Sequence, residues 1–318
     1  MVAEAKKESN LVLIAALLAN LGIAVAKFVA AALTGSSSML TEGFHSVVDS
    51  GNQILLLYGQ KRGHRPPDEA HPFGYGRELY FWAFVVAILI FAVGAGVSIY
   101  EGWLHYVEPE PLQSPTVNYV VLGIAFLLEG TSWVIAMREF TAAHRGQSLW
   151  SAVHRSKDPA TFIVLFEDSA ALIGLVIAAI GVWVSHATGD PRLDGLASIA
   201  IGLVLALVAA LLAREAKGLL IGEGADPRIV GDVRRILDGF PAISHVNHVR
   251  TVHTAPDSVF VAISADFEDA VTMGEAETLI ETMETQLKQE LPILSSIYIR
   301  PEKRENAAVL KTGAPAPA

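Results

Sequence analysis

The 318-residue chain is too apolar for an ordinary soluble domain, because 52% of its residues are hydrophobic and its mean hydropathy is +0.43. The net charge of −10 describes neither half of the chain, since the carboxylates concentrate in the C-terminal third. The absence of cysteine excludes disulfides and thiolate metal sites, and it leaves His, Asp, Glu and Asn as available metal ligands. We therefore expect an integral membrane protein.

The first ten residues, MVAEAKKESN, lack a signal-peptide pattern, and we interpret residues 1–10 as a cytoplasmic N-terminal tail. Six mostly apolar stretches follow, each near the roughly 20 residues with which a helix crosses a bilayer. They lie at 11–34, 38–60, 79–101, 117–138, 160–186 and 194–214. The sequence thus predicts a domain of six transmembrane helices over residues 11–224.

Basic residues gather at alternate ends of these spans: Lys6, Lys7, Lys61, Arg62, Arg65, Arg77, Arg138, Arg145, Arg155, Lys157, Arg214 and Lys217. The three loops at the opposite ends contain Arg192 as their only Lys or Arg. Membrane proteins carry their basic loops on the cytoplasmic side. We therefore expect both termini in the cytoplasm, in a multi-pass protein of the bacterial cell (inner) membrane.

After Asp226 the apolar blocks give way to a soluble pattern. Helix-like periodicity in PRIVGDVRRILDGF and MGEAETLIETMETQLKQEL alternates with strand-like NHVRTVHT, SVFVAISADF and LSSIYIRP. This order predicts a small α+β (αββαβ, ferredoxin-like) cytoplasmic domain over residues 225–302. A core of this size is small, so we expect support from dimerisation. The tail, residues 303–318, is rich in small residues and proline and is expected to be disordered.

Ionisable residues inside the spans mark candidate functional sites, because each costs at least ~2.5–3.5 kcal/mol to insert. In FHSVVDSGNQ of the second span, His45 and Asp49 are spaced i, i+4 and share one helix face. Imidazole nitrogen and carboxylate oxygen can converge there on one divalent cation. Asn52 lies on the same face. The alternative is a polar pair that only joins neighbouring helices.

The fifth span contains VLFEDSAALIG, in which Glu167 and Asp168 are adjacent carboxylates in an apolar helix. Asp168 lies about eight residues, and Asp49 about eleven, from the cytoplasmic ends of their spans, which is a similar depth at ~1.5 Å per residue. A shared cation would offset the cost of burying these carboxylates. We therefore expect the second and fifth spans to contribute to one site.

Three further polar residues lie within the spans. Asn20 of the first span and Glu129 of the fourth come to comparable mid-membrane depth, where transporters bind their ions. Glu129 has the alternative role of hydrogen-bonding a neighbouring helix. Lys27 is expected to be an internal counter-charge, because an ammonium group cannot ligate a metal.

Several stretches resemble the cation diffusion facilitator family over almost the whole chain: KFVAAALTGSSSMLTEGFHSVVDSGNQ, PDEAHPFGYGRELYFW and DPRLDGLASIAIG, followed by the αββαβ domain. The resemblance implies a homodimeric, proton-coupled antiporter that exports divalent metal from the cytoplasm across the lipid bilayer by alternating access. Zinc is the expected substrate, with manganese, iron and cobalt as alternatives. No organic cofactor and no nucleic-acid partner are expected.

The resemblance also implies a tetrahedral transport site made of one residue pair from the second span and one from the fifth. The pairs correspond to His45 with Asp49 and to Val164 with Asp168. Valine cannot bind a metal, and this departure, with the segment LFED, resembles a divergent subgroup that includes a mitochondrial zinc-transporter branch of animals. The replacement ligand is expected from nearby polar groups: Glu167, Glu129, Asn20, Asn52 or a water molecule.

The resemblance points to two further places where relatives bind metal. Asp68 and His71 match a peripheral site, although Tyr75 stands where relatives often have a further histidine. A binuclear zinc site in the cytoplasmic domain corresponds to Asn247, Ser264, Tyr298 and Arg300, which do not suit zinc. The nearby His245, His248 and His253 are expected to be surface or core histidines, because a strand alternates its faces.

Arg77 resembles a basic residue that, in relatives, pairs with an acid after the sixth span and interlocks the protomers. Glu223 is the candidate partner.

The expected chemistry is competition between a metal ion and protons for the same basic groups. The chain has no GxxxxGK[ST] phosphate loop and no nucleophile constellation, which agrees with a secondary active transporter rather than an enzyme. Two alternatives remain: a transport-inactive membrane scaffold or regulatory protein that kept the family fold, and a membrane hydrolase using His45 and Asp49 around a catalytic metal.

Overall fold

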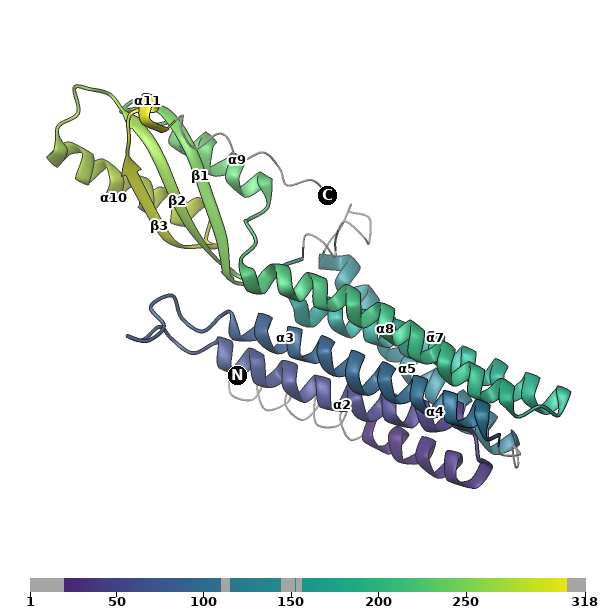
Figure 1. The fold of residues 1–318 in the computed structure, drawn as a ribbon. Coiled ribbons are helices and arrows are strands. Elements are labelled where there is room, and N and C mark those ends of the chain that lie inside the picture. The colour runs from purple at the N-terminus through teal and green to yellow at the C-terminus, as the bar shows by residue number, and fades with distance from the viewer. Residues whose placement is uncertain (1–19, 110–114, 144–151, 153–155, 308–318) are drawn as a thin grey trace, which may run out of the picture. The chain divides into compact units, whose positions relative to one another are not determined.

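The computed structural model describes all residues except 1–19, 110–114, 144–151, 153–155 and 308–318 (Figure 1). The predicted N-terminal tail and the basic residues Lys6, Lys7, Arg145 and Arg155 therefore lie outside the described residues. The chain divides into two compact units. The first contains the chain up to Arg62 and Glu78–Lys217, and the second contains Gly63–Arg77 and the chain from Gly218 onward.

Long helices make up the first unit (Figure 1). After the helix Asn20–Thr34 come α2 (Ser37–Gly63), α3 (Glu78–Leu89), the π-helix η1 (Ile90–Ala95), α4 (Gly96–Val107), α5 (Pro115–Ala143), α7 (Pro159–Thr188) and α8 (Arg192–Ile221). The third predicted span is thus one helical run, α3–η1–α4.

Four helices among the described residues are long and apolar enough to cross a membrane: Glu78–Val107, Thr116–Ala142, Pro159–Thr188 and Arg192–Ile221. The helix Asn20–Thr34 is apolar but shorter, and the rest of the first predicted span lies outside the described residues. α2 is 27 residues long, but its ionisable and hydroxyl side chains lower its hydropathy. Six spans therefore stay a prediction.

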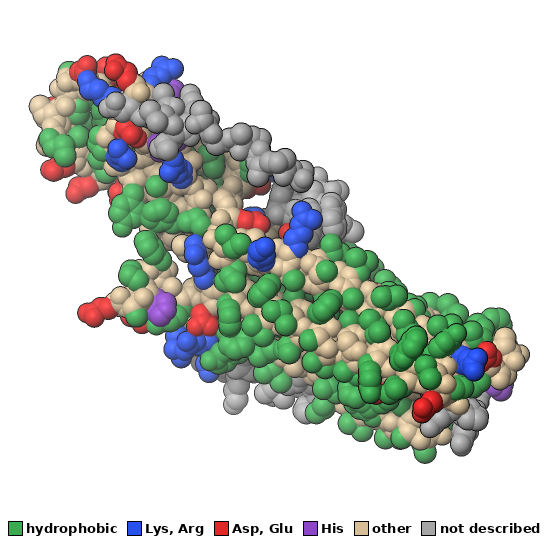
Figure 2. Space-filling view, in the orientation of Figure 1, with side chains coloured by type: hydrophobic (Ala, Val, Ile, Leu, Met, Phe, Trp, Pro, Cys, Tyr) green, Lys and Arg blue, Asp and Glu red, His purple; other side chains and the backbone are tan. Residues whose placement is uncertain are grey.

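The surface of the helical unit is apolar. Leu127 of α5, Trp183 of α7 and Leu207 of α8 are 69%, 63% and 63% exposed, respectively. Figure 2 shows hydrophobic side chains over most of the visible face of this unit. An exposed apolar surface of this extent is suited to lipid rather than to water.

Polar contacts show which helix ends lie together where the first helix ends and α2 begins. Thr34 donates a hydrogen bond of 2.9 Å to Asn118 of α5. The buried carboxylate of Asp194, in the first turn of α8, accepts hydrogen bonds from the Ser36 hydroxyl (3.0 Å) and the Ser38 backbone N–H (3.1 Å). The end of the first helix and the starts of α2, α5 and α8 are therefore neighbours.

The second unit contains the predicted α+β elements: α9 (Pro227–Leu237), β1 (Ile243–Ala255), β2 (Ser258–Phe267), α10 (Met273–Glu290), β3 (Leu294–Pro301) and α11 (Arg304–Ala307). The strands form a sheet in the order β1-β2-β3, with β1 antiparallel and β3 parallel to β2. The predicted order of helices and strands is confirmed. The expected disordered tail begins with the short helix α11, and its residues 308–318 lie outside the described part.

One apolar core holds this unit together. Val233 and Leu237 of α9, Leu287 of α10 and Val261 of β2 are fully buried in it. The segment Gly63–Arg77 belongs to the same unit, and the Phe73 ring packs edge to face on Phe260 at a centroid distance of 5.5 Å.

Candidate metal transport site

The helical unit contains a cavity of about 310 Å³ between four helices. Its polar wall comes from the first helix, α2, α5 and α7, and contains Asn20, Ser46, Asp49, Gln53, Glu129, Thr131, Ser132, Glu167 and Asp168. Asp49 and Asp168, which were expected at a similar depth, line this one cavity. Val164, the position at which the resemblance implies a family ligand, also lines it with an apolar side chain.

His45 and Asp49 lie on one face of α2, as their spacing predicts. The His45 Nδ1 atom is 3.5 Å from the Asp49 Oδ1 atom. His45 is only 2% exposed, and its Nε2 atom has no hydrogen-bond partner among the described residues. His45 is not among the residues that line the cavity, whereas its neighbour Asp49 is.

Each carboxylate of the Glu167–Asp168 pair is held by a different helix. The Asn52 side-chain amide of α2 donates to Glu167 Oε1 at 2.6 Å, and the Ser132 hydroxyl of α5 donates to Asp168 Oδ2 at 3.0 Å. Adjacent helical residues point about 100° apart. Both side chains nevertheless reach the cavity, and their partners fix them in different directions.

Lys27 is an internal counter-charge, as predicted. Its ammonium group donates three hydrogen bonds of 2.9 Å, to Glu42 and Ser46 of α2 and to Glu129 of α5. Lys27 and Glu42 are fully buried. Sequence reasoning missed Glu42 and Ser46, although the rule that marked His45 as an ionisable residue inside a span applies equally to Glu42.

In this conformation the described residues contain no group of three or more His, Asp or Glu side chains close enough to hold a metal ion. Three of the four carboxylates, Glu167, Asp168 and Glu129, are instead bound by Asn52, Ser132 and Lys27, respectively. The predicted ligands therefore share a cavity without forming a coordination shell, and their assignment stays a prediction.

The buried acceptor atoms that have no hydrogen-bond partner among the described residues are suited to a cation. Buried acceptor atoms without a hydrogen-bond partner among the described residues include His45 Nε2, Asp49 Oδ1, Asn52 Oδ1 and Glu129 Oε2. Buried polar atoms are normally paired, and each such exception calls for an explanation. One imidazole nitrogen and several oxygens are ligands for zinc and for other divalent first-row metals.

The predicted peripheral pair, Asp68 and His71, forms a turn. The Asp68 carboxylate accepts hydrogen bonds from the Tyr75 hydroxyl (2.6 Å) and the His71 backbone N–H (2.7 Å). The Tyr75 hydrogen bond, followed by the one from His71, lowers the pKa of Asp68 below its ordinary value. These bonds account for the Asp68 carboxylate without a metal.

The positions of the relatives' binuclear zinc site hold a hydrogen-bonded network. The Asn247 side-chain amide donates to the Ser264 hydroxyl (3.1 Å) and to the Glu302 backbone carbonyl (2.8 Å). Arg300 pairs with the Glu302 carboxylate at 3.2 Å, and Tyr298 is 60% exposed. An amide, a hydroxyl and an ion pair occupy these places, and whether the cytoplasmic domain binds zinc stays untested.

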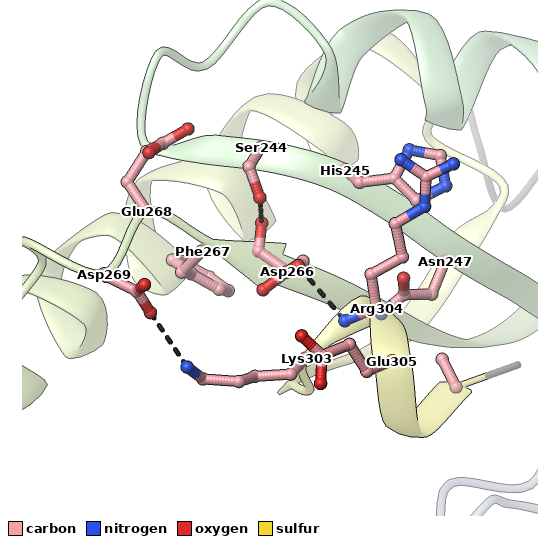
Figure 3. A pocket seen from close by; sticks show the side chains of 11 residues that line it. Ser244, His245, Asn247, Asp266, Phe267, Glu268, Asp269, Lys303, Arg304 and Glu305 are labelled. Atoms are coloured by element: carbon pink, nitrogen blue, oxygen red, sulfur yellow. Dashed lines mark hydrogen bonds and ion pairs between the residues drawn. The ribbon is translucent and has the colours of Figure 1, made fainter.

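The histidines of β1 are separated along the strand, as expected. The His253 side chain is buried, and its Nδ1 atom lies 3.2 Å from the Ala255 carbonyl oxygen. His245 lines a cavity of about 540 Å³ in the cytoplasmic domain (Figure 3). Acidic groups also line this cavity, but Asp269 pairs with Lys303 at 3.1 Å, and Asp266 accepts the Arg304 backbone N–H at 3.1 Å.

The predicted interlocking pair, Arg77 and Glu223, lies within the second unit. A guanidinium nitrogen of Arg77 is 3.6 Å from the place that a Cβ atom would take at Gly222, the residue before Glu223. The pairing stays a prediction.

Comparisons with known proteins agree with this architecture. The cation efflux transmembrane domain matches residues 13–221, and the cation efflux protein cytoplasmic domain matches residues 225–304. The Xenopus laevis protein named "Proton-coupled zinc antiporter SLC30A9, mitochondrial" is 34% identical over 247 residues, which cover 77% of this chain and 44% of the relative. "Metal tolerance protein C4" of Arabidopsis thaliana is 32% identical over 236 residues, 74% of this chain and 52% of the relative.

The bacterial "Cation-efflux pump FieF" of Klebsiella pneumoniae is 24% identical over 266 residues, which cover 81% of each chain. The chain spans about half the length of the frog and plant relatives. The family resemblance noted in the sequence is confirmed: the chain belongs to the cation efflux family, with its transmembrane domain followed by its cytoplasmic domain.

Proposed function

We propose that the chain exports divalent metal cations from the cytoplasm in exchange for protons, by alternating access. The main support is the cavity whose wall contains four carboxylates, Asp49, Glu129, Glu167 and Asp168, in a membrane-spanning unit. Such a group of carboxylates is unfavourable in a membrane unless cations or protons neutralise it. The names of the frog and bacterial relatives describe zinc antiport and cation efflux, respectively.

Exchange of metal for protons follows because both bind to the same carboxylate and imidazole groups. Carboxylates and imidazole bind a metal only when deprotonated, so metal binding releases protons and proton binding releases the metal. A site that opens to either side of the membrane in turn converts this competition into antiport. The proton gradient supplies the driving force.

We propose His45, Asp49 and Asp168 as the principal ligands, with Glu167 as the fourth. Glu167 gives up one hydrogen bond from a neutral amide when it turns to a metal, whereas Glu129 would separate from the ammonium of Lys27. Hydrogen bonds to charged groups are stronger than neutral ones. Glu129, Asn20 and Asn52 remain available as outer contacts. An oxygen-rich site of this kind suits Zn²⁺ first and accepts Mn²⁺, Fe²⁺ or Co²⁺.

The proposal includes six transmembrane helices, α2 and the helix ending at Thr34 among them, and both termini in the cytoplasm. The support is the charge pattern: Lys61 and Arg62 end α2, at the end of the bundle where the other basic residues gather. A homodimer is proposed because the cytoplasmic domain belongs to the domain family of cation efflux proteins. The bacterial cell membrane stays a prediction, because the relatives include one named mitochondrial and one from a bacterium.

Transport into liposomes tests this proposal. The purified full-length protein should accumulate Zn²⁺ in vesicles with an acidic lumen, and His45→Ala, Asp49→Asn and Asp168→Asn should each lower the initial rate at least ~10-fold. Asp257→Asn is the matched control, because this carboxylate is exposed in the turn between β1 and β2. Equal rates in all variants would remove the proposed site, and no transport by the wild type would favour the scaffold alternative.

A further inference from the structure

One ammonium group joins three helices beside the candidate transport site. Lys27 of the first helix contacts Glu42 and Ser46 of α2 and Glu129 of α5, each at 2.9 Å. We call these four residues the Lys27 bridge. The side chains of Lys27 and Glu42 are fully buried and that of Glu129 is 13% exposed, so the bridge lies inside the helical unit.

The cavity of the transport site lies on one side of the bridge. Along the first helix, Asn20 and Ile23 line the cavity and precede Lys27. On α2 the lining residues run from Ser46 of the bridge toward Gly63, and on α5 they run from Leu128 and Glu129 toward Ala143. On α7 they lie between Pro159 and Ala171. We call this side, at the ends marked by Asn20, Gly63, Ala143 and Pro159, the near side.

A second cavity lies on the opposite, far side, where Thr34 meets Asn118 and Ser36 meets Asp194. Its volume is about 590 Å³, and its wall contains Phe28, Leu40, Glu101, His105 and Glu108. It therefore contains ionisable groups next to apolar ones. The near and far cavities share no lining residue.

The Lys27 bridge adjoins both cavities, because its Ser46 and Glu129 line the near one and Phe28 lines the far one. Phe28 follows Lys27 in the chain, and its ring packs edge to face on Phe44 at 5.2 Å. The remaining oxygen of Glu42 lies against Gly174 of α7, where a Cβ atom would collide with it. A path along the first helix from the near cavity to the far one would therefore lead past the ammonium group.

We propose that the Lys27 bridge is the closed far-side gate of the transport pathway in this conformation, an inference that rests on the proposed transport function. The ammonium occupies the place between Glu42 and Glu129 and repels a divalent cation there. Passage requires the ammonium to leave at least one carboxylate, which separates the first helix from α2 or α5. Lys27 is then a positioning residue that never binds the metal.

The absence of cysteine in the chain makes a direct test practicable. Single reporters are placed in the near cavity, Ile23→Cys, and in the far cavity, Leu40→Cys, of the full-length protein. Right-side-out and inside-out membrane vesicles are treated, without metal, with a membrane-impermeant thiol reagent. The near reporter should react in one vesicle type and the far reporter in the other. If the protein has the opposite orientation in the membrane, the two vesicle types exchange their results, and the conclusion is the same.

Removing the ammonium should open the path. In Lys27→Met the near reporter should react from the far side at least ~10-fold faster than in the parent, while Lys27→Arg, which keeps the charge, should restore the parent rate. The thermal unfolding midpoint distinguishes an opened path from a misfolded protein. If Lys27→Met does not fold, Glu42→Gln carries the same measurement, because it removes the ionic link between the first helix and α2.

An unchanged far-side rate in a folded Lys27→Met or Glu42→Gln protein would overturn the gate, and it would show that the aromatic packing alone closes the path. The labelling needs no transport. A wild type that labels asymmetrically but moves no zinc would therefore contradict the proposed function only.

Discussion

Gly174→Ala offers a sharp test of how tightly the Lys27 bridge is built. Gly174 lies in the interior of α7, and a Cβ atom there would collide with Glu42 Oε1 and lie 3.6 Å from the side chain of Ile201. The ammonium of Lys27 holds the other oxygen of the same carboxylate. The added methyl group therefore has to displace Glu42 from Lys27.

The expected effect follows from two opposing contributions. Replacing glycine by alanine inside a helix stabilises by about 1 kcal/mol, and weakening a hydrogen bond to a charged group costs about 1.5–3 kcal/mol. Gly174→Ala should therefore lower the free energy of unfolding by roughly 0.5–2 kcal/mol. Gly51→Ala in α2 is the matched control, because nothing lies within 4 Å of its Cβ position, and it should stabilise.

The assay is denaturant unfolding of the full-length protein in mixed micelles, with the difference between the two variants as the readout. Adding Glu42→Ala should remove the collision, so that Gly174→Ala becomes stabilising in that background, as in a double-mutant cycle. If Gly174→Ala stabilised the wild type as much as Gly51→Ala does, the described position of Glu42 would be wrong.

Three further outcomes are expected. Val164→His should add an imidazole one turn from Asp168 in the wall of the cavity and raise the preference for zinc over manganese in competition transport assays; an unchanged preference would place the metal elsewhere. Asp194→Ala should destabilise by about 2 kcal/mol, because it removes the acceptor at the start of α2, and an unchanged unfolding midpoint would contradict this. Thr272→Ala should destabilise α10 by about 1 kcal/mol, measured by hydrogen exchange of its amides, since Thr272 caps this helix. The hydrogen bonds from Thr272 lower the pKa of Glu275, so their contribution should be present above the unfolded pKa of ~4.3 and should disappear as the pH falls through the lower folded value; protection of α10 that increased toward low pH would refute it.

The sequence predicted most of the helices and strands, because hydrophobic periodicity is a local property. The cytoplasmic domain shows this best: α9, β1, β2, α10 and β3 follow the predicted order. The helix α11 was not predicted, since its four residues carry too little periodicity to be distinguished from a tail. The grouping of Gly63–Arg77 with the cytoplasmic domain depends on long-range contacts such as Phe73 with Phe260, which no local pattern shows.

The residues of the candidate site could be predicted where their side-chain type is unusual for a membrane span. Inside the apolar spans lie the ionisable residues His45, Asp49, Glu167 and Asp168. The free-energy cost of placing such a group in a membrane identifies them as candidates without any structure. Their partners depend on tertiary structure. That Asn52 binds Glu167 and Lys27 binds Glu129 follows from the rotation of each helix about its axis, and hydrophobicity specifies that rotation poorly when every face is apolar.

The location of the bound metal distinguishes a transport site at Asp49 and Asp168 from a site elsewhere in the spans. A structure of the full-length protein loaded with Zn²⁺, with anomalous scattering measured at the zinc edge, would identify the ion and its ligands together. A peak is expected in the near cavity within coordination distance, ~2.0–2.2 Å, of Asp49 and Asp168 oxygens, and it should be lost in Asp49→Asn. A metal bound elsewhere in the spans while this cavity stays empty would contradict it.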